Sequence, residues 1–480
     1  MKMVLIQCPS WMTETPPYNI ALLAAALKKR RHDPICFAFN IELYQHCRES
    51  AEAEKWLGNE RGSSWHERGY VLALIDRFRS CIDGFIDSVL DTGSPIIGFS
   101  IYAISQIFSD EVVKMIKKKD PKKIVIFGGA ECFRSSQGIG MLERKPWLDA
   151  ICFAEAEESL PNLLEIIEEK GKIEPCEGFA YRDRNGKVID CGNPPLIDNF
   201  DSLPFADFSH FDLEKYTKKR LPIITSRGCI SRCSFCNEGT HWRKYYCRSA
   251  DAVFSEISYQ LKKYPSISEF YFNDSLINGN METLEEFCDL MIKNNLNVKW
   301  AGQAIIRKEM TREFLDKLKR AGCSILSYGL ESGSDKVLKL MRKGYNLEIA
   351  ERVIQDTYHA GIDLTFNIIV GFPGETEVEF QETLDFIKRN RKYAKSIPLN
   401  PLYVQNGSEL YKNRKSWEIE FTEGLNNDFF WRTSDNASTY EERMRRLNIC
   451  KKLIGDKVAT DVEKFSINKE TLNTKGNIRK

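Results

Sequence analysis

The chain has 480 residues, which is too many for one ordinary hydrophobic core, so we expect two or three domains. Its 69 Lys and Arg residues balance 68 Asp and Glu residues, and a net charge of +1 gives no electrostatic basis for binding nucleic acid or an anionic membrane. No apolar run is long enough to cross a bilayer, and the short apolar N-terminus is typical of a first strand, so we expect a cytoplasmic protein. The 15 cysteines are an odd number and mostly stand alone in apolar segments, which argues against a disulfide scaffold.

The first third of the chain alternates short apolar runs with amphipathic helical patterns. This rhythm predicts an α/β fold over 1–175, with a parallel sheet covered by helices on both faces, as in a Rossmann-like domain. Charged and aromatic residues at 41–90 indicate a helical insertion. The carboxyl ends of such strands meet at one edge of the sheet, where ligands bind. The expected strands are 4–6, 35–39, 95–101, 124–127 and 150–153.

A different pattern occupies 176–215, where Asn185-Gly186 predicts the turn of a hairpin inside a linker. The βα rhythm returns at 216–405 and predicts a partial (β/α)6 barrel of the TIM type, with its chemistry at the carboxyl ends of the strands. A small α-rich segment follows at 406–480, with a helix at 440–454 and a lysine-rich end that we expect to be disordered. The expected barrel strands are 221–225, 269–272, 298–301, 325–329, 365–370 and 399–404, separated by helices at 250–263, 282–294, 311–321, 334–342 and 346–360.

Three cysteines with ligand spacing follow the first expected barrel strand. Cys229, Cys233 and Cys236 lie within eight residues on one loop, and soft thiolate ligands select an iron–sulfur cluster, zinc or cuprous copper. Three local cysteines leave one iron of a [4Fe–4S] cluster without a protein ligand and open to a substrate. The alternative is a structural zinc site with Cys247 or His241 as the fourth ligand, although a zinc knob normally shows paired Cys-x-x-Cys units.

The spacing Cys-x3-Cys-x-Phe-Cys resembles the signature of the radical S-adenosylmethionine (SAM) superfamily. The resemblance implies that the open iron of a [4Fe–4S] cluster binds the amino and carboxylate groups of SAM. It also implies that an electron from the reduced cluster cleaves the sulfonium, and that the resulting 5′-deoxyadenosyl radical abstracts hydrogen from an unactivated C–H bond. The protein of such an enzyme binds and orients the cofactors and excludes water and oxygen. No catalytic residue beyond the cluster ligands follows from this pattern.

Further segments after successive expected strands resemble the SAM-contact motifs of that family. The second strand is followed by Asp274, although the family's Gly-Gly-Glu is absent there. Arg307 is equally typical of a surface salt bridge, Phe235 of core packing, and Ser332 or Ser334 of a helix N-cap. The resemblance implies contacts to SAM from Phe235, Asp274, Gln303, Arg307, Glu331, Ser332, Ile369 and Gly371.

The order of the two domains resembles that of cobalamin-dependent radical SAM enzymes, and this resemblance covers nearly the whole chain. None of the six histidines lies in the Asp-x-His-x-x-Gly pattern of many cobalamin proteins, so we expect no histidine on the lower face of the corrinoid. The alternative is a Rossmann-like domain that has lost cofactor binding or that recognises a substrate. The implied cobalamin-binding residues are Pro17, Asn19, Ser100, Gly128, Gly129, Glu155 and Glu157.

These resemblances imply a cobalamin-dependent methyltransferase that acts on a carbon or phosphorus centre of a small-molecule substrate. They also imply a low-potential ferredoxin or flavodoxin as the electron donor. A cobalamin-dependent radical SAM cyclase or oxidoreductase is the first alternative, and a non-catalytic cobalamin or iron–sulfur sensor is the second. A methylated product carries added mass, whereas a cyclised product does not, and reductive cleavage of SAM excludes a sensor.

Overall fold

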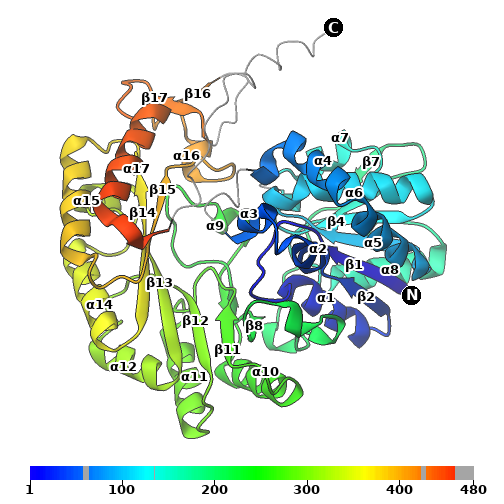
Figure 1. Cartoon of the computed structure of the whole chain (residues 1–480), viewed down its shortest axis with the longest axis horizontal. Helices are drawn as coiled ribbons and strands as arrows, with labels where there is room; N and C mark the ends of the chain where they lie inside the picture. Colours follow the sequence, from blue (N-terminus) through cyan, green and yellow to red (C-terminus); the bar gives the residue numbers. More distant parts are fainter. Residues whose placement is uncertain (58–63, 135, 423–428, 460–480) are drawn as a thin grey trace. The chain divides into compact units, whose positions relative to one another are not determined.

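The structure is a computed structural model in which the chain forms two compact units (Figure 1). The first unit contains residues 1–227 and 246–273, and the second contains 228–245 and the chain from 274 onward. Each unit is an α/β structure with parallel strands, as the sequence predicts. The described residues are 1–57, 64–134, 136–422 and 429–459.

The first unit is built on a seven-stranded sheet with the order β2-β1-β3-β4-β5-β6-β7. Its first five strands run parallel, and they are the five strands that the sequence predicts. All five residues of β3 are buried, because a central parallel strand is covered on both faces and needs a continuous apolar run. The strands are β1 (Lys2–Gln7), β2 (Asp33–Phe37), β3 (Ile96–Ser100), β4 (Ile124–Gly128), β5 (Ala150–Cys152), β6 (Phe179–Arg182) and β7 (Val188–Asp190).

Helices lie on both faces of this sheet (Figure 1). One group contains α1, which packs beside α8, and the other contains α5, which contacts α2, α4 and α6. The predicted helical insertion at 41–90 is confirmed by α2 to α5, apart from residues 58–63, which lie outside the described residues. The helices are α1 (Tyr18–Lys29), α2 (Phe39–Cys47), α3 (Glu54–Leu57), α4 (Arg68–Arg77), α5 (Arg79–Asp91), α6 (Gln106–Lys119), α7 (Gly138–Arg144) and α8 (Ser159–Lys170).

The predicted hairpin at the Asn-Gly turn forms, but its assignment to a linker is wrong. Strand β6 pairs antiparallel with β5, and β7 pairs antiparallel with β6, so the hairpin extends the sheet of the first unit. The physical reason is burial, since Phe179, Ala180 and Tyr181 are covered only when the hairpin joins the sheet. The predicted boundaries at 175 and 215 therefore do not mark a separate linker.

The start of the expected barrel belongs to the first unit. Strand β8 (Arg220–Ile223) pairs parallel with β11 (Glu269–Phe272), and α10 (Ala250–Lys263) connects them. Between them, β9 (Ser226–Arg227) pairs antiparallel with β10 (Tyr246–Cys247). The loop that carries the three cysteines connects β9 to β10 in the chain.

The second unit contains the remaining strands of the βα repeat in the parallel order β18-β15-β14-β13-β12. In Figure 1 its helices α11, α12, α14 and α15 line one side of these strands. The predicted strands and helices are present, and the six-stranded partial barrel as a whole stays a prediction. The elements are β12 (Lys299–Ala304), β13 (Cys323–Glu331), β14 (Asp363–Val370), β15 (Ile397–Pro401), β18 (Val458–Ala459), α11 (Met281–Lys293), α12 (Arg312–Arg320), α13 (Asp335–Leu340), α14 (Leu347–His359) and α15 (Glu377–Asn390).

The C-terminal segment adds α16 (Glu409–Lys412), an antiparallel pair of β16 (Ile419–Phe421) and β17 (Trp431–Thr433), and α17 (Tyr440–Ile454). The predicted helix at 440–454 is therefore confirmed. The lysine-rich end that we expected to be disordered lies outside the described residues. Of the helices that the structure describes, none combines the length and apolar character that a bilayer span requires.

Candidate functional site

The loop after β9 brings the three predicted cluster ligands to one cavity. Cys229, Cys233 and Cys236 line a cavity of about 380 Å³ in the second unit. The loop starts at Gly228, whose φ of 76° lies in the left-handed region that favours glycine. The backbone then folds back on itself, with the N–H of the third cysteine donating to the carbonyl of the second at 3.1 Å.

A buried serine between the second and third cysteines fixes the conformation of this loop. The N–H of Ser234 donates to the carbonyl of Met341 at 3.1 Å, and its hydroxyl donates to the carbonyl of Leu340 at 3.1 Å. Its own carbonyl accepts a hydrogen bond from the N–H of Leu410 at 3.0 Å. The end of α13 and the start of α16 therefore hold the cluster loop from outside the cysteine motif.

The donor set at the cavity suits a cluster with one open iron. Neither alternative fourth ligand lines the cavity: His241 Nε2 lies 3.3 Å from the amide nitrogen of Asn237, and Cys247 belongs to β10. The acidic side chain at the cavity is Glu409, which is ion-paired with Arg342. Within the described ranges, no group of three His, Cys, Asp or Glu side chains is arranged to hold a metal ion, and this includes the three cysteines, although all three line the same cavity. Three cysteines with no fourth Cys or His among the described residues of the cavity fit a [4Fe–4S] cluster better than structural zinc.

The thiols are partly buried and are hydrogen-bonded by the backbone. Burial, with a smaller contribution from the neighbouring Cys229, raises the pKa of Cys233 and raises the pKa of Cys236 to about 12. The N–H of Ser231 donates to Cys229 Sγ, and the N–H of Glu238 donates to Cys236 Sγ, both at 3.4 Å. Because thiolates are the ligands of iron, metal binding must release protons from these thiols. Hydrogen bonds to sulfur are one of the ways in which a protein sets the potential of a cluster.

A buried lysine that the sequence analysis missed lies beside the cluster loop. Lys343 Nζ is 3.1 Å from Glu331 Oε1 and 5.4 Å from the centre of the Phe235 ring. Burial alone would lower the pKa of Lys343, but Glu331, Tyr345 and Cys233 together raise it above its usual value. Lys343 in turn partly offsets the effect of burial on the pKa of Cys233. The structure thus gathers three predicted site residues around one buried cation.

The residues predicted to contact SAM after β11 and β12 differ in how deeply they are buried and in the contacts that they make. Asp274 follows β11 and is buried, whereas Gln303 lies on β12 with an exposed side chain. The Arg307 guanidinium donates to the carbonyl of Asn278 at 2.8 Å and also approaches Glu309. These contacts give Arg307 a structural role in holding the loop after β11, and its contact with SAM remains a prediction.

The residues predicted to contact SAM after β13 and β14 are tied into local structure. The buried Ser332 hydroxyl lies 3.2 Å from Thr383 Oγ1 and accepts a hydrogen bond from the backbone two residues on, near the start of α13. Gly371 has a φ of 80°, and a side chain there would collide with Arg443. Ile369 lies on β14 and packs against the core of the second unit. Both Ser332 and Gly371 therefore have structural roles as well as their predicted one.

In the first unit, the strand order reverses between β1 and β3, which is where an open α/β sheet forms its ligand crevice. The Asn19 amide lies at this point, donating to Gln7 Oε1 at 3.4 Å and to the Ser100 hydroxyl. Pro17 precedes α1 as its N-cap residue in an extended conformation. The structure therefore brings three of the predicted cobalamin-binding residues, Pro17, Asn19 and Ser100, to the switch point.

The end of β4 adds two glycines to the same edge of the sheet. Gly128 is paired with Ser100, and its carbonyl accepts a hydrogen bond from the N–H of Ile101 at 2.7 Å. Gly129 has a φ of 96°, and a Cβ there would lie 2.8 Å from both the backbone nitrogen and the carbonyl oxygen of Ile101. Only glycine fits this close approach of two chain segments. The loops that follow β1, β3, β4 and β5 contain no histidine.

The two glutamates predicted after β5 are engaged by a residue that the sequence analysis did not connect with them. Arg227 donates to Glu155 Oε1 at 2.7 Å and also binds Glu157, and all three side chains are at most 7% exposed. Tyr246 hydrogen-bonds Glu155, and the Phe200 ring lies 5.0 Å from the guanidinium. Burial would lower the pKa of Arg227, but the two carboxylates raise it above its usual value. Arg227 therefore pairs with both carboxylates of the loop after β5 and offsets one of their two negative charges, and the contact of this loop with cobalamin stays a prediction.

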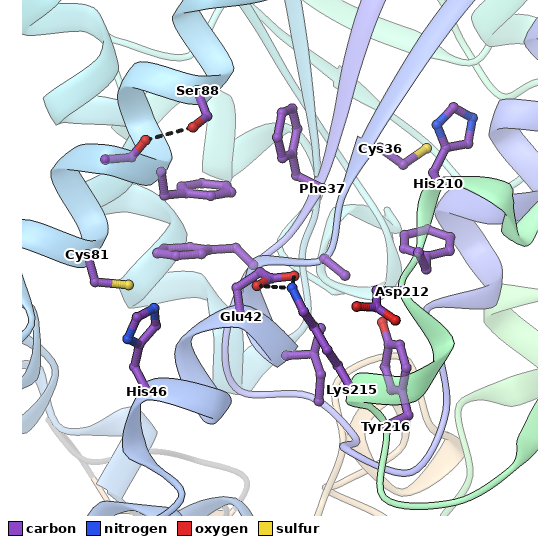
Figure 2. Close-up of a pocket in the computed structure, with 16 residues that line it drawn as sticks. Cys36, Phe37, Glu42, His46, Cys81, Ser88, His210, Asp212, Lys215 and Tyr216 are labelled. Carbon is purple, nitrogen blue, oxygen red and sulfur yellow. Dashed lines mark hydrogen bonds and ion pairs between the residues drawn. The ribbon is translucent and has the colours of Figure 1, made fainter.

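A second cavity of about 400 Å³ lies in the first unit between β2, α2, α5 and the chain before β8 (Figure 2). Its wall contains the stacked rings of Phe39 and Phe85, and Glu42 and Lys215 form an ion pair of 2.7 Å at its edge. The Tyr216 hydroxyl is buried and has no hydrogen-bond partner among the described residues. None of the seven predicted cobalamin-binding residues lines this cavity, so it is distinct from the predicted crevice.

Comparison with protein families gives a match to the radical SAM superfamily over residues 223–387, which include the cluster loop. These residues form a radical SAM domain. The radical SAM domain identifies the chain as an enzyme, and its family uses a [4Fe–4S] cluster and SAM as cofactors.

Similarity to known proteins extends beyond the radical SAM domain. An uncharacterized methyltransferase of Pyrococcus horikoshii is 24% identical over 70% of this chain and 72% of its own length. An anaerobic magnesium-protoporphyrin IX monomethyl ester cyclase of Rubrivivax gelatinosus is 28% identical over 57% of this chain, which spans half of that protein. The structure of the radical SAM methyltransferase TsrM from Kitasatospora setae, with cobalamin and a [4Fe–4S] cluster bound, matches 93% of this chain and 84% of its own, with a TM-score of 0.66 and 15% identity. This likeness shows a shared fold.

Gly228 gives a first test of how the radical SAM domain positions its cluster loop. We expect Gly228→Ala to lower the iron content after reconstitution, because the left-handed backbone costs alanine about 1–2 kcal/mol and the added Cβ would lie 2.6 Å from the Lys244 carbonyl oxygen. Iron and sulfide analysis and the midpoint of thermal unfolding measure the effect. Gly344→Ala is the matched control, since a Cβ there meets no atom within 4 Å. Equal iron contents in the two variants would contradict the prediction.

Gly129 gives the corresponding test in the first unit. We expect Gly129→Ala to cost about 1–3 kcal/mol and to weaken cobalamin binding, because alanine can neither adopt this backbone conformation at low energy nor avoid Ile101. Thermal unfolding and titration with hydroxocobalamin, followed by absorbance, measure the two effects. Gly69→Ala on α4 is the control, since a Cβ there meets no atom within 4 Å. A Gly129→Ala variant that is as stable as this control would show that the crevice tolerates a side chain.

Proposed function

We propose that this chain is a cobalamin-dependent radical SAM methyltransferase. The observation that carries the proposal is the cavity that Cys229, Cys233 and Cys236 line together, with no fourth Cys or His among the described residues that line it. A cluster held by three thiolates keeps one iron free for the amino and carboxylate groups of SAM. When bound, the cluster and SAM supply a 5′-deoxyadenosyl radical, and the residues of this chain bind, orient and shield them.

In this proposal the buried Lys343 supports the cluster. Its positive charge next to Cys233 favours the thiolate form and offsets the negative charge of a thiolate-bound cluster. Glu331 holds Lys343 in place through their ion pair. Phe235 packs beside the same cation, and we expect its ring to contact the adenine of SAM.

We assign cobalamin to the crevice at the switch point between β1 and β3. The assignment is supported by the close packing of the β4 turn at Gly129, by the polar pair of Asn19 and Ser100, and by the shared fold with TsrM. With no histidine in the surrounding loops, the lower face of the corrinoid would have no imidazole ligand. Because Arg227 engages Glu155 and Glu157, the loop after β5 would approach the corrinoid through its backbone.

The Rubrivivax relative favours a second candidate, a cobalamin-dependent cyclase or oxidoreductase. A methyltransferase that takes its methyl group from SAM releases S-adenosylhomocysteine, whereas a cyclase does not. We propose a small-molecule substrate and a low-potential ferredoxin or flavodoxin as the electron donor in either case.

Anaerobic purification with iron, sulfide and corrinoid analysis is the first test of this function. The reconstituted enzyme is then incubated with SAM, cobalamin and reduced methyl viologen, and 5′-deoxyadenosine and S-adenosylhomocysteine are quantified. We expect both products, and SAM labelled on its methyl group should transfer the label to cobalamin. A fully loaded enzyme that forms no 5′-deoxyadenosine would refute the radical SAM proposal, and one that forms it without S-adenosylhomocysteine would favour the cyclase.

A further inference from the structure

The cavity beside the edge strand β2 of the first unit has an aromatic wall (Figure 2). The rings of Phe39 and Phe85 stack with their centres 3.6 Å apart, and the Phe37 ring stands nearly perpendicular to Phe85 at 5.6 Å. The volume of about 400 Å³ lies within the roughly 300–1,000 Å³ of ordinary small-molecule sites. Because aromatic rings pack favourably against one another, this wall favours a flat aromatic ligand.

Two polar atoms on the wall that precedes β8 have no hydrogen-bond partner. The Tyr216 hydroxyl and His210 Nε2 are both buried, and neither is hydrogen-bonded by any of the described residues. His210 Nε2 lies 3.8 Å from Asp207 Oδ2, which is beyond hydrogen-bond distance. Burial raises the pKa of Tyr216 and lowers the pKa of His210, so both side chains are uncharged at neutral pH. A buried polar group without a partner costs free energy, and a ligand that bonds to it offsets that cost.

The charged side chains at the cavity argue against an anionic ligand. Both oxygens of Glu42 accept hydrogen bonds from Lys215 Nζ, at 2.8 and 2.7 Å, so this ammonium group is already engaged. Asp212 also lines the cavity, and in the part of the chain that the structure describes no cation lies within ion-pair distance of it. Two carboxylates therefore accompany one ammonium group, and the cavity has no excess positive charge to bind an anion.

Hydrogen bonds hold the walls of the cavity in place. The Gln45 side chain on α2 donates to the carbonyl of Lys215 at 2.5 Å. The N–H of Thr217 donates to the carbonyl of Thr13 at 2.9 Å, which fixes the end of the same wall. On α5, Gly84 lines the cavity, and a Cβ there would meet no atom within 4 Å. The site is therefore preformed, and the missing side chain on α5 leaves space for a ligand.

We propose that this cavity is a binding site for a small, uncharged aromatic molecule that carries a hydroxyl or amide group. The aromatic wall would contact the ring of the ligand, and Tyr216 and His210 would hydrogen-bond its polar group. None of the residues assigned above to the cluster, SAM or cobalamin lines the cavity. The inference therefore goes beyond the proposed function and does not rest on it.

Binding of 2-naphthol to the full-length chain tests this inference. This probe is flat and uncharged with one hydroxyl group, whereas naphthalene lacks the hydroxyl and 2-naphthoate has a carboxylate in its place. The Kd of each probe is measured by equilibrium dialysis for the wild type, Tyr216→Phe and Gly84→Leu. Tyr264→Phe and Gly69→Leu are the matched controls, because one removes a buried hydroxyl and the other fills open space on α4, both outside the cavity. The midpoint of thermal unfolding shows whether each variant is folded.

We expect the wild type to bind 2-naphthol at least tenfold more tightly than 2-naphthoate. Tyr216→Phe should raise the Kd of 2-naphthol about tenfold and leave that of naphthalene unchanged, because one hydrogen bond is lost. Gly84→Leu should raise the Kd of both uncharged probes by filling the cavity, and the two control variants should change neither value.

Three results would overturn the inference. They are no binding of 2-naphthol to the wild type, equal binding of 2-naphthoate, and an equal effect of Tyr216→Phe on 2-naphthol and naphthalene. Displacement of 2-naphthol by hydroxocobalamin would also overturn it, because the cavity would then belong to the corrinoid site. A chain that binds 2-naphthol as expected but forms no 5′-deoxyadenosine when loaded would refute the proposed function alone.

Discussion

Replacing Cys233 with alanine is expected to yield a folded chain that holds no [4Fe–4S] cluster and forms no 5′-deoxyadenosine. Two of the three predicted ligands would remain, and neither His241 nor Cys247 lines the cavity to replace the missing thiolate. The loss of activity should exceed the ~10–100-fold effect of removing an outer-sphere partner of a metal site. Visible absorbance, iron and sulfide content, and SAM cleavage, all measured anaerobically on one preparation, check the prediction.

Two control variants separate a cluster from structural zinc. Cys288→Ala removes a buried thiol on α11 and should keep full iron content, because Cys288 belongs to the core. Cys247→Ala should also keep the cluster. If the wild type held zinc in place of iron, and if Cys233→Ala and Cys247→Ala both lost it, the three thiols and Cys247 would form a closed zinc site and the radical mechanism would be wrong.

The cluster loop could be predicted from the sequence because its ligands are local. Cys229 and Cys236 are seven positions apart on a loop between a strand and a helix, so spacing alone places them near one another. Local sequence also determines where α10 and α17 begin, and their bounds match the prediction. In each case a capping residue directly precedes a helical apolar pattern. Ser249 accepts a hydrogen bond from the N–H of Ala252, and Thr439 caps α17 in the same way.

The contacts that support the site could not be predicted, because they join residues far apart in the sequence. Lys343 reaches Cys233 from a turn more than a hundred residues later, and nothing in its neighbours marks it as a buried cation. The hairpin at β6 and β7 carries a correct turn signal, but whether it joins a sheet depends on an edge that only the fold provides. Glu331 lies in a left-handed conformation with a φ of 75°, at a register shift in β13 that no apolar pattern reveals.

Arg227 is the residue for which we expect the largest effect on stability. Arg227→Met would leave Glu155 and Glu157 buried without a countercharge, and breaking such an ion network by removing one partner costs about 3–5 kcal/mol. For a unit of this size the loss corresponds to a fall in Tm on the order of 10 °C. Calorimetry is the suitable measurement, because the two units need not unfold in one transition.

The triple variant Arg227→Met, Glu155→Gln and Glu157→Gln separates the cost of unpaired charge from the loss of packing. Removing all three charges should recover most of the lost Tm, since an uncharged set does not leave buried carboxylates unpaired. Arg227→Lys keeps one positive charge but cannot bind both carboxylates with a planar guanidinium, so it should lie between the wild type and Arg227→Met. Because Arg227 precedes the first cluster cysteine by two residues, iron content should follow stability through this series. A Tm for Arg227→Met within 2 °C of the wild type would show that the two carboxylates do not depend on Arg227, and the link from β9 to the loop after β5 would then carry no energetic weight.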